Sequence, residues 1–315
     1  MKRARFASVS AVSSILKTLL LIVPFAITSC AGFNGKSGST FVIEGLSSPE
    51  SVAMTADGKR VFISNMGEKL EPSAKDGDGY ITEVSPDGSV ITKKFLPNSK
   101  SKKLNGPKGM AIIGKNLYVA DIDRVVGFDI TTRAQVFEMD FSAEKTVFLN
   151  DLAVYDDKTL FLSATDIGKI FKLTLAPKPS YNLVEEGIAG PNGLYYDKER
   201  DRLYVVGFGE GGKFNGALGM VVFNGEKPKY TKLSADGGAL DGVALLPGGR
   251  LIYSDWVAFD KPGMLLVYDL NTGFFTELKL SQPVRGPADL YYDAPRNMLW
   301  LPKMMEGKVL VEEVR

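Results

Sequence analysis

Short apolar runs separated by polar turns fill the chain from residue 40 onward. The runs are rich in Val, Ile, Leu, Phe and Tyr, the residues that β-strands favour. Turn signals such as Asp57-Gly58, Asp87-Gly88 and Gly248-Gly249 lie between them. No long segment repeats its apolar residues with the 3.6-residue period of a helix. The pattern therefore predicts an all-β protein.

One pattern recurs six times: a Pro or Leu, a polar residue, a small or polar residue, a short apolar run, a turn and a second apolar run. The copies begin at Pro49, Pro107, Leu149, Pro191, Leu240 and Pro287, at intervals of 42 to 58 residues. Each copy divides into four strands, which in the second copy we expect near 108–113, 116–120, 124–129 and 134–139. Four-stranded propeller blades repeat every ~40–50 residues. The repeats therefore predict a six-bladed β-propeller over residues 40–315.

The sixth copy holds three strands, near 288–293, 298–302 and 308–313, before the chain ends. The apolar run Thr40–Ile43 precedes the first copy and belongs to none. Pairing this run with Val309–Val311 would complete the last blade and cover an exposed strand edge. Two stacked β-sandwiches would explain neither the six repeats nor the extra strand.

The N-terminal segment has the features of an export signal. Met1–Arg5 is basic, and Leu19–Ile27 is apolar but too short to span a bilayer as a helix. Small residues then precede Cys30, as at a signal-peptidase site. The run Ile27-Thr28-Ser29-Cys30 resembles the bacterial lipobox, in which the cysteine becomes the lipidated first residue of the mature chain.

We therefore expect a lipoprotein signal peptide over residues 1–29 and a flexible Gly- and Ser-rich tether over 30–39. Lipidation of Cys30 would anchor the protein to a membrane without spanning it. Ala31 after the cysteine implies, by the same resemblance, sorting to the outer membrane of a bacterium that has one. The expected location is the bacterial cell envelope, at the outer membrane or its periplasmic face.

Composition removes several kinds of chemistry. The chain has no histidine and one cysteine, which excludes Ser-His-Asp catalysis, histidine-ligated zinc and an intramolecular disulfide. Without residues 1–29 it carries 34 basic and 37 acidic residues, which argues against a nucleic-acid-binding protein.

The second residue of each copy is expected at the mouth of the central channel, because the first strand of a blade lies innermost. We call these six positions the ring; they are Glu50, Lys108, Asn150, Asn192, Asp241 and Ala288. The loops after the second strands rise on the same face. Three of these loops are long, over 65–79, 208–215 and 256–263, which marks this face as functional.

Two carboxylates and two carboxamides in one ring form an oxygen-rich set for a hard cation. We expect one divalent cation at Glu50, Asn150, Asn192 and Asp241. Ca²⁺ is the first choice, Mn²⁺ and Mg²⁺ are alternatives, and Zn²⁺ is the least natural without histidine or thiolate ligands. Asn and Asp also favour turns, which explains one such residue better than four of six equivalent positions.

The segments Leu149-Asn150-Asp151, Pro191-Asn192-Gly193 and Leu240-Asp241-Gly242, preceded by Pro49-Glu50, resemble the senescence-marker-protein / gluconolactonase / luciferin-regenerating family of regucalcin-like proteins. The resemblance covers residues 40–315. It implies a six-bladed propeller that hydrolyses small sugar lactones or esters with one divalent metal. It also implies that Glu50, Asn192 and Asp241 bind the metal, that Asn150 contacts substrate beside it, and that Asp241 is the acid–base group.

Two features depart from the family. Val147-Phe148-Leu149 is apolar where the family usually has an arginine, and Lys108 is a cation in the ring. Lys108 could bind an anionic substrate, repel the metal or point into solvent. We also expect Asp121 and Trp256 at the substrate, Trp256 as a cap that stacks on a sugar ring.

The alternative function is a non-catalytic propeller, a binding or assembly module on the membrane surface, since propellers serve many functions. An ammonium of Lys108 bonded to the ring carboxylates would favour this alternative. Neither the substrate nor a protein partner is identified by the sequence.

Overall fold

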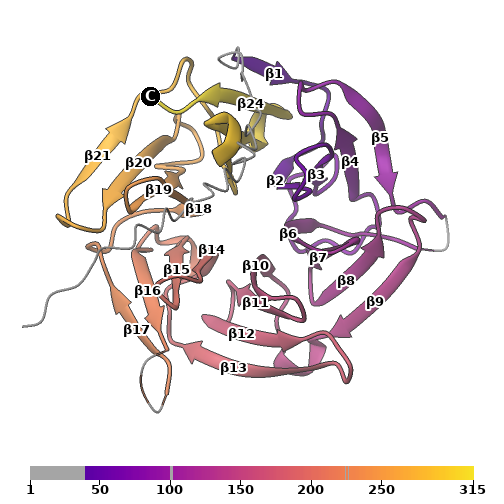
Figure 1. Cartoon of the computed structure of the whole chain (residues 1–315), viewed down its shortest axis with the longest axis horizontal. Helices are drawn as coiled ribbons and strands as arrows, with labels where there is room; N and C mark the ends of the chain where they lie inside the picture. Colours follow the sequence, from indigo (N-terminus) through magenta and orange to yellow (C-terminus); the bar gives the residue numbers. More distant parts are fainter. Residues whose placement is uncertain (1–39, 100–101, 224, 226) are drawn as a thin grey trace, which may run out of the picture. The chain divides into compact units, whose positions relative to one another are not determined.

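The computed structural model describes residues 40–99, 102–223, 225 and 227–315. These residues form six four-stranded antiparallel sheets arranged around a common centre (Figure 1). The prediction of an all-β, six-bladed propeller is confirmed. The predicted signal peptide, tether and lipidated Cys30 lie outside the described residues. Within the described ranges, no helix is long and apolar enough to cross a membrane.

The first three blades follow the chain from the inside outward, one strand after the next. Blade 1 consists of β2 (Pro49–Met54), β3 (Val61–Asn65), β4 (Tyr80–Val84) and β5 (Val90–Leu96). Blade 2 consists of β6 (Pro107–Ile113), β7 (Asn116–Asp121), β8 (Arg124–Asp129) and β9 (Gln135–Asp140), and blade 3 of β10 (Leu149–Asp156), β11 (Thr159–Ala164), β12 (Lys169–Thr174) and β13 (Ser180–Glu186). The strands of blade 2 lie within one residue of their predicted bounds.

The remaining blades repeat this order. Blade 4 consists of β14 (Pro191–Asp197), β15 (Arg202–Gly207), β16 (Leu218–Val222) and β17 (Lys229–Lys232), and blade 5 of β18 (Leu240–Leu246), β19 (Arg250–Asp255), β20 (Met264–Asp269) and β21 (Phe275–Leu278). Blade 6 consists of β22 (Tyr291–Asp293), β23 (Met298–Lys303), β24 (Lys308–Glu313) and β1 (Phe41–Ile43). Short 3₁₀ turns are η1 (Ser142–Glu144), η2 (Glu210–Gly212), η3 (Ala294–Arg296) and η4 (Met304–Glu306).

Blade 6 joins the two ends of the described chain. β1 pairs antiparallel with β24, so that Phe41 lies opposite Val311 and Ile43 opposite Val309. Figure 1 shows β1 in indigo beside β24 in yellow. The inner strand β22 is shorter than predicted and begins at Tyr291 rather than near 288.

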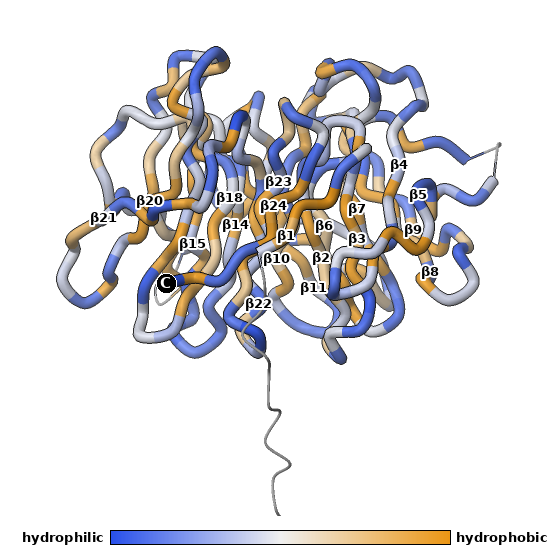
Figure 2. The backbone as a smooth tube through the Cα atoms, turned by 90° about the horizontal axis from the view of Figure 1, so that it is seen from above, coloured by the Kyte–Doolittle hydropathy of each residue, from blue (hydrophilic) through white to orange (hydrophobic). Residues whose placement is uncertain are grey.

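The hydrophobic core lies between neighbouring blades, not inside any one of them. Six clusters of buried apolar side chains each join two adjacent blades. The cluster between blades 6 and 1, for example, packs Trp300 against Val52 and Ile63. Both faces of each sheet are therefore covered, which explains the continuous apolar runs of the inner strands. The edge-on view shows apolar strand segments between polar loops on two faces (Figure 2).

Each of the first five inner strands carries the same irregularity near its start. The pairing with the second strand shifts between the first and fourth residues, as between Leu149 and Leu152 in β10. Such a bulge bends the strand and re-aims the side chains inside it. Five of the six ring residues lie inside these bulges, so the repeated bulge sets their direction.

In three of the six copies, a glycine at the third position lets neighbouring inner strands approach closely. A Cβ at Gly193 would lie 2.2 Å from the Asp241 carbonyl oxygen, and one at Gly242 would lie 2.4 Å from the Leu290 nitrogen. A larger residue at these two positions would force neighbouring blades apart. The glycines of the repeat therefore keep the ring narrow.

Candidate metal and substrate site

Five of the six ring residues line one cavity on the face of the long loops. The cavity has a volume of about 260 Å³ and is bounded at the ring by Glu50, Lys108, Asn150, Asn192 and Asp241. All five side chains are buried, between 0% and 3% exposed. The ring predicted from the repeat is thus brought together at the base of a cavity.

Four oxygens of the ring are buried and have no hydrogen-bond partner in the described chain. They are Glu50 Oε2, Asn150 Oδ1, Asn192 Oδ1 and Asp241 Oδ1. A buried polar atom without a partner is costly, and each one in a folded protein calls for an explanation. These oxygens belong to the four residues expected to bind a cation, and their chemistry fits Ca²⁺ or a similar hard ion.

The two ring carboxyls are held in an environment that opposes negative charge. Burial raises the pKa of Glu50 well above its ordinary value, and the charge of Asp241 adds to the rise. Burial likewise raises the pKa of Asp241, with the charge of Asp289 as the second cause, while the hydrogen bond from Trp256 opposes the rise. A cation between these carboxyls would favour their charged forms.

The donor set is unusual in having few acids. Among the described residues, no group of three or more His, Cys, Asp or Glu is placed to hold a metal ion. The ring would supply two carboxylates, from Glu50 and Asp241, and two carboxamides. Two carboxylates balance the charge of one divalent cation, and the amide oxygens complete a neutral set.

Lys108 is fully buried, which excludes the reading that it points into solvent. Its ammonium donates hydrogen bonds to the carbonyl oxygens of Pro72, at 2.7 Å, and Gly106, at 3.1 Å. It also lies 4.7 Å from the centre of the Phe148 ring. Burial lowers the pKa of Lys108 to about 8, although the charge of Glu50 opposes the shift. Lys108 thus ties the loop that carries Pro72 to the ring.

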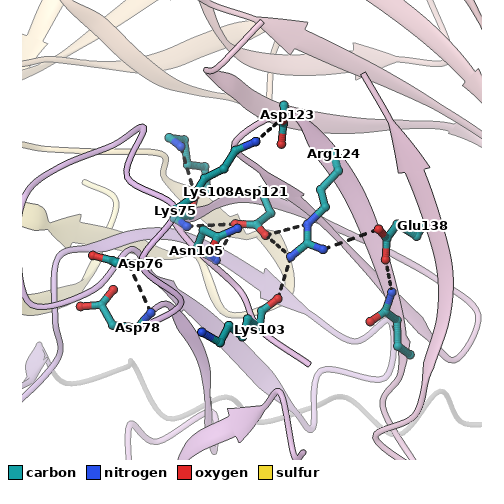
Figure 3. A network of polar contacts seen from close by, with 12 residues as sticks. Lys75, Asp76, Asp78, Lys103, Asn105, Lys108, Asp121, Asp123, Arg124 and Glu138 are labelled. Atoms are coloured by element: carbon teal, nitrogen blue, oxygen red, sulfur yellow. Dashed lines mark hydrogen bonds and ion pairs between the residues drawn. The ribbon is translucent and has the colours of Figure 1, made fainter. Parts of the chain in front are cut away.

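Asp121, which was predicted to contact substrate, is not among the residues that line the cavity, and its role stays a prediction. Its carboxylate accepts hydrogen bonds from the backbone of Asn105 and Gly106 and from the Arg124 guanidinium (Figure 3). Asp121 pairs with Arg124 because the two residues face each other across the β7–β8 hairpin. This ion pair stabilises the hairpin and the loop before β6.

Trp256 lines the cavity, as its place after β19 suggested. Its indole N–H donates a 2.8 Å hydrogen bond to Asp241 Oδ2, whereas Oδ1 is buried without a partner. Trp256 therefore orients the carboxylate that was expected to act as acid and base.

Sequence reasoning missed a set of serines that position the ring. Ser163 on β11 accepts a hydrogen bond from the Asp151 N–H and donates one to the Asn192 carbonyl in the next blade. Ser254 on β19 does the same between Gly242 and Ala288. The sequence does contain a pattern that points to these serines, because Ser64, Ser163 and Ser254 occupy the same position in three repeats.

A second layer of acids lies below the ring. Asp151 and Asp289 line a cavity of about 380 Å³ lower in the channel. Asp151 accepts hydrogen bonds from the N–H groups of Leu152 and Leu194, and Asp289 accepts one from the Ser51 hydroxyl. These two carboxyls have a structural role, because each accepts hydrogen bonds from backbone or side-chain groups of the inner strands.

Burial raises the pKa of Asp289 to about 7. A carboxyl with a raised pKa stabilises the fold at low pH, and that stabilisation is lost as the pH rises from about 4 through 7. The free energy of unfolding of the native protein should fall between pH 5 and pH 8. In Asp289→Asn this fall should be smaller by about 2–3 kcal/mol, because the titrating carboxyl is gone. Urea unfolding in the presence of a chelator measures this. Equal pH dependence in both proteins would contradict it.

Fold and site together define a six-bladed β-propeller with a central cavity whose base carries the oxygens of the ring. No protein-family model matches the chain, and no curated protein matches it by sequence. Solved structures do resemble it. A putative gluconolactonase is 15% identical, with a TM-score of 0.60, over 87% of this chain and 92% of its own.

Two further structures show the range of proteins with this fold. A putative 6-phosphogluconolactonase from Bacteroides fragilis is 14% identical, with a TM-score of 0.54, over 80% of this chain and 76% of its own. A catalytically inactive virginiamycin B lyase from Staphylococcus aureus, solved with quinupristin, is 14% identical, with a TM-score of 0.56, over 87% of this chain and 99% of its own. At these identities the likeness shows the fold alone.

Proposed function

We propose that this protein is a divalent-cation-dependent hydrolase of a small lactone or ester. The observation that carries the proposal is the set of four unpartnered, buried oxygens on Glu50, Asn150, Asn192 and Asp241. All four residues line one cavity. A cation held by them would act as a Lewis acid on the carbonyl of a bound lactone.

The side chains of the ring have distinct tasks in this reaction. Asp241 lines the cavity, and its Oδ1 has no hydrogen-bond partner in the described chain. This oxygen would accept a proton from the attacking water and return it to the leaving alkoxide as the ester C–O bond breaks. The Trp256 N–H holds the other oxygen, so the carboxylate keeps its direction. Lys108 holds Pro72 at the cavity wall. No histidine is needed.

The alternative, a non-catalytic binding module, is less well supported. Pairing of the Lys108 ammonium with the ring carboxylates would have favoured it. In the described chain its hydrogen bonds go instead to the carbonyl oxygens of Pro72 and Gly106. The ring oxygens are therefore left for another partner.

Titration calorimetry with Ca²⁺, Mn²⁺ and Mg²⁺ tests the proposed site. We expect one ion to bind, and Glu50→Gln to weaken its binding by about 100-fold or more, because half of the ligand charge is lost. Glu312→Gln is a matched control, since Glu312 is also buried but accepts its hydrogen bonds from Ser281 in blade 6. No ion binding by the native protein, or equal affinity in Glu50→Gln, would contradict the proposal.

A further inference from the structure

The walls of the ring cavity are apolar. Beyond the five ring residues, the cavity is lined by Met66, Leu70, Pro72, Phe148, Phe208, Trp256, Phe259 and Met304. Apart from the indole N–H of Trp256, every polar side-chain group among the lining residues is thus at the ring. A bound molecule would meet oxygens and one ammonium at one end and carbon along its sides.

These walls come from loops of several blades. Met66, Leu70 and Pro72 belong to the β3–β4 loop, Phe208 follows β15, and Trp256 and Phe259 follow β19. Met66, Trp256 and Met304 form a buried cluster separate from the six inter-blade cores. The lining extends outward, because Leu70 is 41% and Phe259 51% exposed. An apolar surface therefore leads from solvent to the ring.

Aromatic contacts hold one wall in place. The Trp256 ring packs edge-to-face against Phe208, with centroids 5.6 Å apart, and against Phe259, also at 5.6 Å. Phe214 packs behind them, 5.9 Å from Phe208. The Trp256 N–H is already bonded to Asp241. The wall is thus built before any ligand binds and offers that ligand no further side-chain donor.

A polyhydroxylated ligand fits these walls poorly. Each hydroxyl buried against carbon loses its hydrogen bonds to water and finds no replacement, which weakens binding by about tenfold or more per group. Transfer of an alkyl group from water to these walls strengthens binding instead, by about fourfold per methylene. The cavity therefore discriminates strongly between sugar-like and apolar molecules of the same ring size.

We propose that the substrate is a hydrophobic lactone or ester, whose carbonyl faces the ring and whose alkyl or aryl part lies against Phe208, Trp256 and Phe259. This inference rests on the proposed hydrolase function and specifies its substrate class. It replaces the sugar lactone that the family resemblance implies.

Binding of γ-lactams with straight alkyl chains of increasing length tests the inference without turnover. Calorimetry should show affinity rising about fourfold per added methylene until the cavity is filled. The kcat/KM values for the corresponding γ-lactones should rise in parallel. Gluconolactone should bind no more tightly than unsubstituted γ-butyrolactone.

Phe259→Ala should reduce this dependence on chain length by about half or more, because it removes the outer part of the wall. Phe274→Ala is the matched control: this phenylalanine is 76% exposed in the β20–β21 turn and does not line the cavity. It should leave the dependence unchanged.

Two results would overturn the inference: an affinity that does not change with chain length, or tighter binding of gluconolactone than of alkyl lactones. If cations bind and gluconolactone is the preferred substrate, the hydrolase function stands and the apolar substrate class fails. If alkyl lactams bind with the expected dependence but no cation binds and no lactone is hydrolysed, the apolar ligand site stands and the hydrolase function fails.

Discussion

Replacing Asp241 with asparagine is expected to lower the rate of lactone hydrolysis by about 10³-fold or more. The variant loses the group that accepts and returns a proton, which contributes about 10²–10⁴-fold in enzymes of known mechanism. It also loses one of the two carboxylates that face the cavity, so cation affinity should fall as well. Steady-state kinetics and cation titration on the same preparations measure both effects.

The substitution is conservative in every other respect. An asparagine oxygen can still accept the hydrogen bond that Trp256 donates to Asp241 Oδ2. Since burial opposes the charge of Asp241, a neutral amide should not lower the unfolding free energy.

Glu312→Gln is the matched control for Asp241→Asn. Glu312 is also a buried acid, but it lies on β24 of blade 6 and does not line the ring cavity. We expect this variant to keep its hydrolysis rate within about threefold. Equal rates in Asp241→Asn and the native protein would remove Asp241 from the mechanism.

Replacing both Phe41 and Ile43 with alanine is expected to reduce the free energy of unfolding by about 5 kcal/mol. Ile43 is 3% exposed in the cluster between blades 6 and 1. The Phe41 ring meets Trp300 edge-on, with centroids 5.8 Å apart. β1 also covers the edge of β24, so its loss would expose unpaired backbone groups that promote aggregation.

Urea unfolding followed by circular dichroism measures this loss, and light scattering measures the aggregation. Phe275→Ala is the matched control, because Phe275 lies on the outer strand β21 and is 64% exposed. Phe275→Ala should change the free energy of unfolding by no more than about 0.5 kcal/mol. An unchanged midpoint in the double variant would show that β1 contributes little to closing the propeller.

The repeats allowed the propeller to be predicted because one blade is one unit of sequence. Each copy carries its own strands and turns, and the copies can bury their apolar faces only against each other. The position of Glu50, Asn150, Asn192 and Asp241 in a common ring followed from the same periodicity. Even the partner of the extra strand Phe41–Ile43 could be named, since the last copy lacked one strand.

The partners of individual side chains could not be predicted in this way. Asp121 was expected at the substrate, but its carboxylate is used by Arg124 and by backbone N–H groups. Lys108 was left open between three roles, and it is buried against a carbonyl oxygen 36 residues earlier in the chain. Such choices depend on which loop reaches the side chain, which neither spacing nor residue type encodes.

By itself, the sequence determined the number of blades, the approximate bounds of the strands in blade 2 and of most strands in blade 6, and the residues that supply the oxygen atoms at the centre. The tertiary structure decided the chemistry of the space above them. The apolar wall is made by Leu70, Phe148, Phe208, Phe259 and Met304, which lie in loops that are distant in sequence and converge only when the ring of blades closes. Because a cavity is a property of surfaces brought together, its hydrophobic character became visible only in the folded chain.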